Sequence, residues 1–259
     1  MADNIVRINQ PRDVLLKNMT RLDELVGAAL AAPPSLPRLA LFTGWSGYGK
    51  SFAAAYAAAQ HQAFYVEANE FWTRSTMLKA LCSAMGLISD RLTSYDMALR
   101  IAERLVASGR ALIIDEFDVV ADRGMVGVVR SLHKATSAPI IMIGEEALPN
   151  KLTKVEHFHN LIGFPGQAQP CDLEDARALA RLYCKNVEVA DGLLTDCITA
   201  TGGSARRISA NLNDVRRVAH GKGMKQIDLE TWGDRLWITG DALEVRKQPG
   251  LIRAGGRKV

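Results

Sequence analysis

The sequence has no long hydrophobic run and no paired cysteine motif. Its four cysteines, Cys82, Cys171, Cys184 and Cys197, are scattered along the chain and form no Cys-x-x-Cys pair. This spacing argues against a zinc site and favours a reduced protein with buried thiols. No apolar stretch approaches the roughly 20 residues that a membrane-spanning helix needs. The sequence therefore predicts a protein without membrane contact.

The start of the chain, residues 1–4, also lacks the basic and then apolar pattern of a secretory signal. Hydrophobic residues make up 48% of the 259 residues, and the formal net charge is +4. This composition predicts a soluble, cytoplasmic protein with one α/β domain and a small appendage, or with two modest domains. The positive charge permits nucleic-acid binding without requiring it.

A glycine-rich loop between an apolar run and an Ala-rich stretch is the most informative motif. Residues 44–51 read Gly-Trp-Ser-Gly-Tyr-Gly-Lys-Ser, which is the pattern G-x-x-x-x-G-K-[ST] in its strand–loop–helix context. In such a P-loop, backbone N–H groups surround phosphate oxygens, Lys50 reaches the β- and γ-phosphates, and the Ser51 hydroxyl ligates Mg²⁺. We therefore expect ATP and Mg²⁺ as cofactors. The expected nucleotide-binding residues are Gly44, Ser46, Gly47, Tyr48, Gly49, Lys50, Ser51 and Phe52.

Short apolar runs alternate with helical patterns over the first two thirds of the chain. Runs of this kind are typical of a parallel sheet that helices cover on both faces. We predict an α/β fold with a P-loop core and a five-stranded parallel sheet. The expected strands are residues 39–43, 63–66, 111–114, 139–144 and, with a weaker pattern, 161–164. The expected helices are residues 12–31, 51–59, 75–87 and 94–108.

The strand patterns stop near Asp172, and helical patterns continue to the end of the recognisable structure. They cover residues 172–188, 191–200, 204–220 and 228–236, which predicts a small C-terminal α-helical lid. We divide the chain into an N-terminal extension with one helix (1–38), a nucleotide-binding core (39–170), the helical lid (171–238) and a basic tail (239–259) that we expect to be flexible.

Two carboxylates directly follow the third predicted strand. At the tip of a buried strand, Asp115 can hold the Mg²⁺ shell together with Ser51, and Glu116 can polarise a water for attack on the γ-phosphate. A general base in this position favours hydrolysis over phosphoryl transfer to a bound acceptor. The alternative is an acidic strand end without a catalytic role.

Two further side chains are candidates for contact with the γ-phosphate. The fourth strand should lie between the strands that carry the two motifs, and Glu145 at its tip is a candidate sensor that can accept but not donate a hydrogen bond. Residues 201–208 begin a helix with Ser204 as its N-cap. In its first turn, Arg206 can fold onto the γ-phosphate and couple nucleotide state to the lid angle, whereas Arg207 is expected to face solvent or DNA.

These motifs together resemble the AAA+ superfamily and, within it, the transposition ATPases related to the phage Mu B protein (MuB), with IstB and TnsC as more distant relatives. The resemblance covers roughly residues 39–215 and rests on TGWSGYGKS, YVEANEFWTRSTML, LIIDEFD, IIMIGEEALPNKL and TGGSARRI. It implies an ATPase that forms helical oligomers on duplex DNA and selects or activates target DNA for a DNA transposase. ATP hydrolysis would then drive disassembly of the oligomer.

The resemblance also implies where DNA would bind. Thr73 and Arg74, with Lys79 following, occupy the region that the relatives direct toward DNA, and Arg123 and Arg130 are further candidates. Such contacts would go to phosphates, so binding would be non-specific and steeply salt-dependent. The alternative for Arg74 is a solvated helix start.

Two features depart from the pattern of these relatives. Only 38 residues precede the first strand, too few for the N-terminal helix-turn-helix domain of the larger phage proteins. Residues 151–160 also contain no arginine to complete the active site of a neighbouring subunit. A lysine of this segment, Arg123 or Arg130 would have to substitute, or hydrolysis would be slow.

Three alternative functions stay open at this point. One is a helicase or clamp loader of the same fold, which would need a replication partner. Another is a nucleotide-switched DNA scaffold with little turnover, which the missing arginine suggests. A small-molecule kinase is the least favoured, because the sequence shows no recognisable acceptor pocket and Glu116 suits water better than a substrate hydroxyl.

Overall fold

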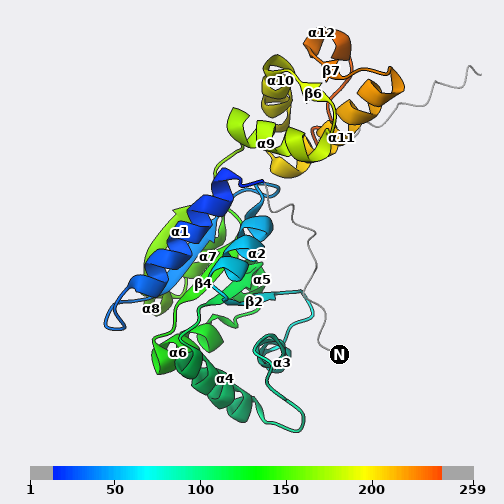
Figure 1. Cartoon of the computed structure of the whole chain (residues 1–259). Helices are drawn as coiled ribbons and strands as arrows, with labels where there is room; N and C mark the ends of the chain where they lie inside the picture. The colour runs from blue at the N-terminus through cyan, green and yellow to red at the C-terminus, as the bar shows by residue number, and fades with distance from the viewer. Residues whose placement is uncertain (1–13, 241–259) are drawn as a thin grey trace, which may run out of the picture.

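A computed structural model of the chain describes residues 14–240. It consists of an α/β core and a smaller, mostly helical unit that lies over one end of the core (Figure 1). The basic tail predicted from residue 239 onward falls outside the described residues from 241 on, as do residues 1–13 of the predicted N-terminal extension.

The core is built on a sheet of five parallel strands in the order β2-β3-β4-β1-β5. As predicted, β4 lies between β3 and β1, the two strands that carry the sequence motifs. The weakly predicted fifth strand is present at the edge and is longer than expected. The strands are β1 (Leu39–Thr43), β2 (Phe64–Glu67), β3 (Leu112–Asp115), β4 (Ile140–Gly144) and β5 (Ile162–Gln167).

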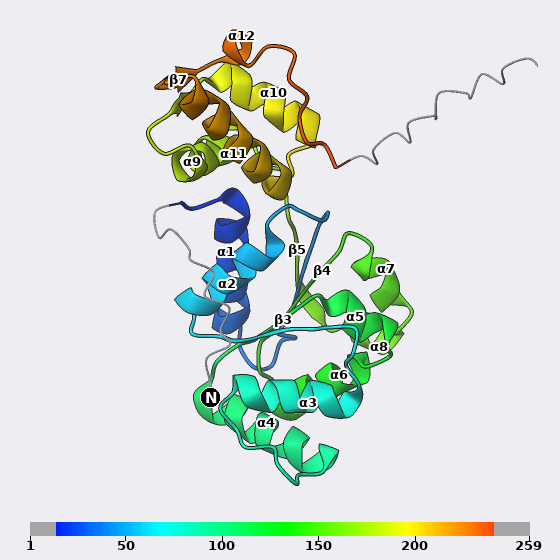
Figure 2. The same cartoon turned by 90° about the vertical axis from the view of Figure 1, so that its right-hand side faces the viewer.

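Successive side chains of each strand pack against different layers of helices. Leu39 and Leu41 of β1 belong to one hydrophobic core, whereas Ala40 and Phe42 belong to the other. Helices α1 (Lys17–Ala31) and α2 (Lys50–Gln60) cover the second of these faces, and helices α3 to α8 cover the first (Figure 2). This two-sided burial explains why the strands read as continuous apolar runs.

The helices on the larger layer differ in how well the sequence predicted them. Helices α3 (Arg74–Ala84) and α4 (Ser94–Ser108) were predicted, and the side chains of Thr73 and Thr93 cap their first turns. Helices α5 to α8 were not predicted individually, since three of them are too short to show a helical period. They are α5 (Phe117–Asp122), α6 (Val126–Thr136), α7 (Leu148–Thr153) and α8 (Glu156–His159).

The C-terminal unit differs from the prediction in the ends of two helices and in a small sheet. The predicted helix 228–236 is shorter and ends at Trp232. The predicted helix 172–188 ends at Tyr183, and two-residue strands, β6 (Glu188–Val189) and β7 (Gln226–Ile227), pair in parallel. Strands of this length leave no readable alternation, so the purely helical prediction was wrong here. The helices are α9 (Leu173–Tyr183), α10 (Asp191–Thr201), α11 (Ala205–Gly221) and α12 (Leu229–Trp232).

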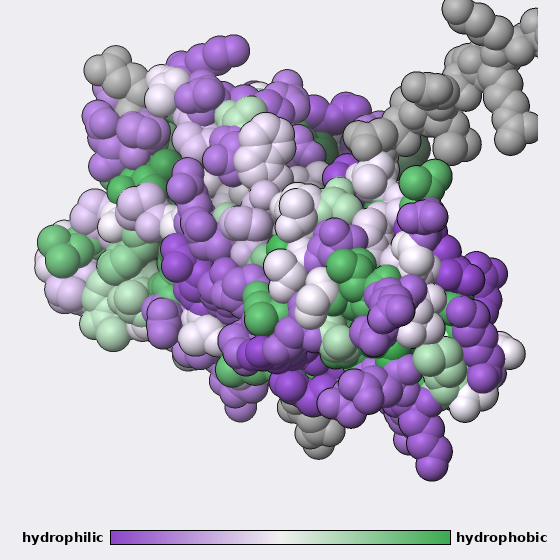
Figure 3. Space-filling view, turned by 90° about the horizontal axis from the view of Figure 1, so that it is seen from above, coloured by the Kyte–Doolittle hydropathy of each residue, from purple (hydrophilic) through white to green (hydrophobic). Residues whose placement is uncertain are grey.

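The C-terminal unit has a hydrophobic core of its own, in which the rings of Trp232 and Trp237 stack with their centroids 4.7 Å apart. Seen from above, the molecule presents a mainly hydrophilic surface with hydrophobic side chains in small groups (Figure 3). Between residues 14 and 240, no helix combines the length and the apolar character that crossing a membrane requires.

Candidate active site

The glycine-rich loop connects the end of β1 to the first residue of α2, as the motif requires. Gly47 and Gly49 have φ angles of 85° and 82°, a left-handed conformation that favours glycine. A Cβ atom on Gly47 would also lie 2.4 Å from the Ser204 Oγ of the helical unit. Glycine at this position thus permits both the curvature of the loop and the close approach of α11.

The Lys50 ammonium is held inside this loop. Its Nζ donates hydrogen bonds to the carbonyl oxygens of Gly44 (2.6 Å) and Trp45 (3.1 Å). Burial lowers the pKa of Lys50, whereas the negative charges of Glu116 and Asp115 oppose this shift. The structure therefore brings the loop and the tip of β3 into electrostatic contact, with α2 contributing the positive end of its dipole.

Asp115 is fixed at the end of β3 by two hydrogen bonds. The side chain is almost completely buried; its Oδ1 accepts from the Glu116 N–H (2.9 Å), and its Oδ2 accepts from the Tyr65 hydroxyl (3.2 Å). Burial, and then the charge of Asp115, raise the pKa of Tyr65, which keeps its hydroxyl a donor. Sequence reasoning missed Tyr65, which lies on the neighbouring strand β2.

The residues present fit a nucleotide with Mg²⁺. Asp115 and Ser51 offer carboxylate and hydroxyl oxygens, which are ligands that Mg²⁺ prefers, and Lys50 supplies positive charge for phosphate oxygens. Ser46, Ser51 and Phe52 are all exposed at the mouth of the loop, and Tyr48 is half-buried. When bound, Mg²⁺ would neutralise phosphate charge during hydrolysis.

Glu116 has an unusual backbone conformation. Its φ and ψ angles of 52° and 42° place a non-glycine residue in the left-handed region at the start of α5. Such strain is concentrated at functional sites. Protein atoms around the carboxylate, followed by the charge of Asp115, raise the pKa of Glu116. A raised pKa makes the ionised carboxylate a stronger base, which suits its predicted role in activating water.

Asp118 links the end of β4 to this site, and sequence reasoning missed it. Its Oδ2 accepts a hydrogen bond from the Glu145 N–H (2.7 Å), so the backbone of Glu145 is held against α5. A Cβ atom on Gly144 would lie 2.3 Å from the same oxygen, which explains why glycine ends the strand. Glu145 lies where the sequence predicted it, at the tip of β4 and near enough to Lys50 to affect its pKa.

The first turn of α11 rests on the glycine-rich loop. The Arg206 N–H donates to the Gly47 carbonyl oxygen (3.1 Å), and the Tyr48 hydroxyl donates to the Gly202 carbonyl oxygen (3.5 Å). The side chain of Arg206 is exposed beside the loop. In contrast, the Arg207 guanidinium lies against Gly240, where an added Cβ would be 2.6 Å from its Nε. Arg206 is therefore the better placed of the two for a bound phosphate.

The predicted DNA-binding residues lie on more than one surface. Thr73, Arg74 and Lys79 are exposed on or before α3, although the Thr73 hydroxyl already accepts a hydrogen bond from the Thr76 N–H (3.3 Å). Arg74 also lines a largely apolar groove of about 650 Å³ between α3, α4 and α6. Arg123 is exposed at the end of α5, directly before a residue that lines the same groove.

Arg130 points to a different part of the surface. It lines a hollow of about 480 Å³ together with Lys134 and His157, near the start of the sheet rather than near its active-site edge. Of the predicted cations, Arg74 lines the groove and Arg130 lines the hollow, and both depressions lie against helix α6. The predicted DNA-binding residues therefore do not all line one groove, and their common role stays a prediction.

The segment that lacks an arginine has its first lysine engaged within the same chain. Lys151 Nζ lies 2.7 Å from Asp122 Oδ2 and 3.1 Å from Asp118 Oδ1. The hydrogen bond to Asp122 is the main cause of the raised pKa of Lys151. As placed here, Lys151 serves its own subunit and is not free to complete a neighbour's site.

Comparisons with known proteins agree with this geometry. Residues 35–152 match the family described as AAA domain, and no curated protein matches the sequence. The solved structure of Orc1 from Aeropyrum pernix in complex with DNA is similar, with 19% identity, a TM-score of 0.59, and coverage of 85% of this chain and 64% of that one.

Two other solved structures show a comparable similarity. Cdc6p from Pyrobaculum aerophilum has 16% identity, a TM-score of 0.62, and coverage of 84% of this chain and 66% of that one. The Walker-type ATPase paby2304 of Pyrococcus abyssi has 17% identity, a TM-score of 0.58, and coverage of 75% and 66%. This chain therefore spans 64% to 66% of the length of these proteins, which is less than two thirds.

The comparisons do not single out the transposition ATPases related to MuB, IstB and TnsC, so that narrower resemblance stays a prediction. The matched segment includes the glycine-rich loop, both carboxylates after β3 and the whole of β4. The chain has the α/β P-loop fold seen in AAA+ proteins, and its residues 35–152 match the AAA domain family.

Proposed function

We propose that this chain hydrolyses ATP, that it binds duplex DNA, and that its nucleotide state controls how long it stays bound. The observation that carries the proposal is the hydrogen bond between the Arg206 N–H and the Gly47 carbonyl oxygen (3.1 Å), which joins the helical unit to the glycine-rich loop. A ligand that reshapes the loop would change the angle between unit and core, and a change of this kind can switch a second binding surface.

Exposed cations support DNA as the second ligand. Within residues 14–240, no hydrogen bond or ion pair engages the guanidinium groups of Arg74 and Arg123, so both are available for phosphate oxygens. The similar Orc1 of Aeropyrum pernix was solved in complex with DNA. Binding through these groups would depend on charge and not on base sequence.

Within this class, the function we propose is selection of target DNA for a DNA transposase by a helical oligomer in the cytoplasm, with ATP hydrolysis driving disassembly. The motifs that resemble MuB-type proteins support it. So do two exposed aromatic side chains beside the loop, Trp45 (62% exposed) and Phe52 (49% exposed), because they offer apolar area to a second copy of the chain. A helical oligomer needs such a head-to-tail contact.

A second candidate is a DNA-bound scaffold that is switched by nucleotide but hydrolyses ATP very slowly. The engagement of Lys151 with Asp118 and Asp122 favours it, since this pairing removes one cation that would otherwise reach a neighbouring site. Measurable ATP turnover that rises on addition of duplex DNA would count against the scaffold.

Negative-stain electron microscopy of the protein with linear duplex DNA tests the proposal most directly. We expect helical coating of the DNA with ATP or a slowly hydrolysed analogue, and bare DNA without nucleotide. The Lys50→Ala variant serves as the control and should leave the DNA bare in both conditions, because it lacks the phosphate-binding cation. Bare DNA with the wild-type protein in both conditions would exclude the filament.

A further inference from the structure

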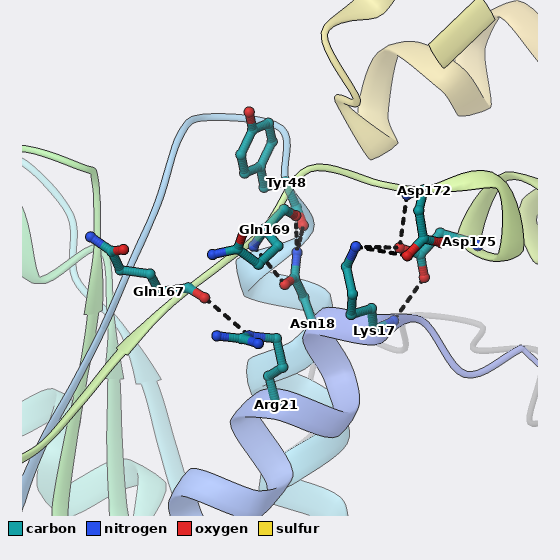
Figure 4. Close-up of polar contacts among 8 residues, drawn as sticks. All are labelled: Lys17, Asn18, Arg21, Tyr48, Gln167, Gln169, Asp172 and Asp175. Atoms are coloured by element: carbon teal, nitrogen blue, oxygen red, sulfur yellow. Dashed lines mark hydrogen bonds and ion pairs between the residues drawn. The ribbon is translucent and has the colours of Figure 1, made fainter. Parts of the chain in front are cut away.

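The first turn of α1 is joined to three parts of the molecule by one polar network (Figure 4). At its centre is Asn18, which is only 5% exposed. Its Nδ2 donates to the carbonyl oxygens of Tyr48 (2.8 Å) and Gln169 (2.8 Å), and its Oδ1 accepts from the Gln169 N–H (2.9 Å). The nitrogen and the oxygen of this buried amide are thus both hydrogen-bonded.

The contact with Tyr48 fixes a peptide group of the glycine-rich loop. The carbonyl of Tyr48 and the N–H of Gly49 belong to the same planar trans peptide and point in opposite directions. Holding the oxygen toward α1 therefore aims the Gly49 N–H away from α1, on the side where a P-loop surrounds phosphate. In the part of the chain that the structure describes, this N–H makes no backbone hydrogen bond, so it is available to a ligand.

The contacts with Gln169 fix the linker between core and helical unit, which is formed by residues 168–172. Neighbouring residues of α1 hold the elements on both sides of this segment. Arg21 Nε donates to the Gln167 carbonyl oxygen (3.2 Å) at the end of β5. On the other side, the Lys17 N–H donates to Asp175 Oδ1 (2.8 Å), in the first turn of α9. Of these three residues of α1, Asn18 is the one whose contacts described here include the glycine-rich loop as well.

We propose that Asn18 is a positioning residue of the ATPase. Its amide holds the Tyr48–Gly49 peptide ready for phosphate, and it transmits any rotation of that peptide to the linker. A bound nucleotide that pulls on the Gly49 N–H would shift the Tyr48 carbonyl oxygen, then the Asn18 amide, and finally the backbone of Gln169. Asn18, which makes this link between loop and linker, belongs neither to the glycine-rich loop nor to the motif that contains Asp115 and Glu116.

The test compares Asn18→Ala and Asn18→Asp with the wild type in the full chain. Affinity for a fluorescent ATP analogue with Mg²⁺ should fall about three- to tenfold in both, the effect of one or two hydrogen bonds. Hydrogen exchange at residues 168–172 should slow on nucleotide binding in the wild type and not in the variants. Arg21→Ala is the matched control, because it loses a contact from the same helix to the residue directly before the linker but no contact to the glycine-rich loop.

Asn18→Asp separates positioning from folding. The carboxylate keeps the size of the amide and the acceptor for the Gln169 N–H, but in its ionised form it cannot donate to the carbonyl oxygens of Tyr48 and Gln169. If folded variants bind nucleotide as the wild type does, and nucleotide still slows exchange in the linker, Asn18 is only a structural residue and the proposal is wrong. If nucleotide does not change hydrogen exchange at residues 168–172 of the wild-type protein, the proposal is also wrong, regardless of the result for the variants.

Discussion

At the scale of single residues, the role of Glu116 as the general base can be tested most directly. The Glu116→Gln substitution keeps the size of the side chain but removes the base. We expect ATP turnover to fall by about 10²- to 10⁴-fold, while nucleotide affinity changes little. Steady-state phosphate release and binding of a fluorescent ATP analogue measure the two effects. Glu70→Gln, at a nearby exposed carboxylate, should leave both unchanged.

The raised pKa of Glu116 adds a prediction about pH. The base works only when ionised, so kcat/KM should fall as the pH drops through this pKa. Because burial and Asp115 raise the value, activity should be lost at a higher pH than an ordinary glutamate would give. A pH profile of kcat/KM locates the acid limb. An acid limb at the value of an unperturbed glutamate would argue against Glu116 as the base.

Tyr65 tests whether the metal-holding carboxylate needs external support. Tyr65→Phe deletes the hydrogen bond to Asp115 Oδ2 (3.2 Å) and little else. We expect the Mg²⁺ concentration needed for half-maximal turnover to rise about tenfold, as is typical when a partner of a metal ligand is lost. Titrating Mg²⁺ at saturating ATP measures the change. Tyr56→Phe on α2 is the control, since its ring is only partly buried and its hydroxyl makes no hydrogen bond within residues 14–240.

The residues that sequence analysis found and missed differ in how far apart their partners lie. Lys50 and the Asp115–Glu116 pair belong to short contiguous motifs, so spacing alone predicted their roles. Tyr65 lies 50 positions from Asp115, and Asn18 lies 30 from Tyr48. Such pairs form only when the sheet and α1 are assembled, and no local pattern marks them. The left-handed backbone of Glu116 is likewise a property of the folded chain.

At the scale of elements, the sequence predicted the strands and helices whose apolar residues form a clear pattern along the chain. All five core strands were found because each is a short apolar run that helices cover on both faces. The two-residue strands β6 and β7 were missed, since pairing and not composition defines them. Helices α5, α7 and α8 were also missed, because six residues or fewer are too short to show a helical period.

The close packing of Gly144, at the end of β4, against Asp118 of α5 leads to a prediction about the stability of the protein. In Gly144→Ala, the new methyl group would lie 2.3 Å from Asp118 Oδ2 and 2.5 Å from Leu148 Cδ2. Relieving this overlap should cost about 1–3 kcal/mol of unfolding free energy. Thermal unfolding should show a decrease of roughly 2–4 °C for each kcal/mol lost. Turnover should also fall, because the Glu145 backbone would move.

Gly127→Ala is the matched control for this substitution. Gly127 lies near the start of α6, and a Cβ atom there would meet nothing within 4 Å. Alanine in a helix with free space raises stability by about 0.5–1 kcal/mol. Opposite signs at the two glycines would confirm that packing against α5, and not glycine content, determines the cost. Equal effects would contradict the packing at Gly144.

At the scale of the whole molecule, α1 and the glycine-rich loop connect two units with separate hydrophobic cores. The sequence analysis predicted a core and a helical lid that divide near residue 170, and that division stays a prediction. It did not predict that α1 would hold the linker. The motif resemblance named DNA contacts by position along the chain, and the structure places Arg74 in one groove and Arg130 in a separate hollow. Only the folded surface can show which of these cations face the same way.

That separation predicts different effects on DNA binding. Arg74→Ala and Arg123→Ala should each weaken binding equally across duplex sequences, and each should reduce the slope of log K against log salt concentration by about 1, the signature of one lost phosphate contact. Fluorescence anisotropy with labelled duplexes at several salt concentrations gives both quantities. Arg177→Ala is the control, because its guanidinium is paired with Asp191 in the helical unit and should leave the slope unchanged. If Arg130→Ala alone lowers the slope, the DNA lies at the hollow beside Lys134 and not at the α3 groove, and the nucleotide switch must act through a different surface.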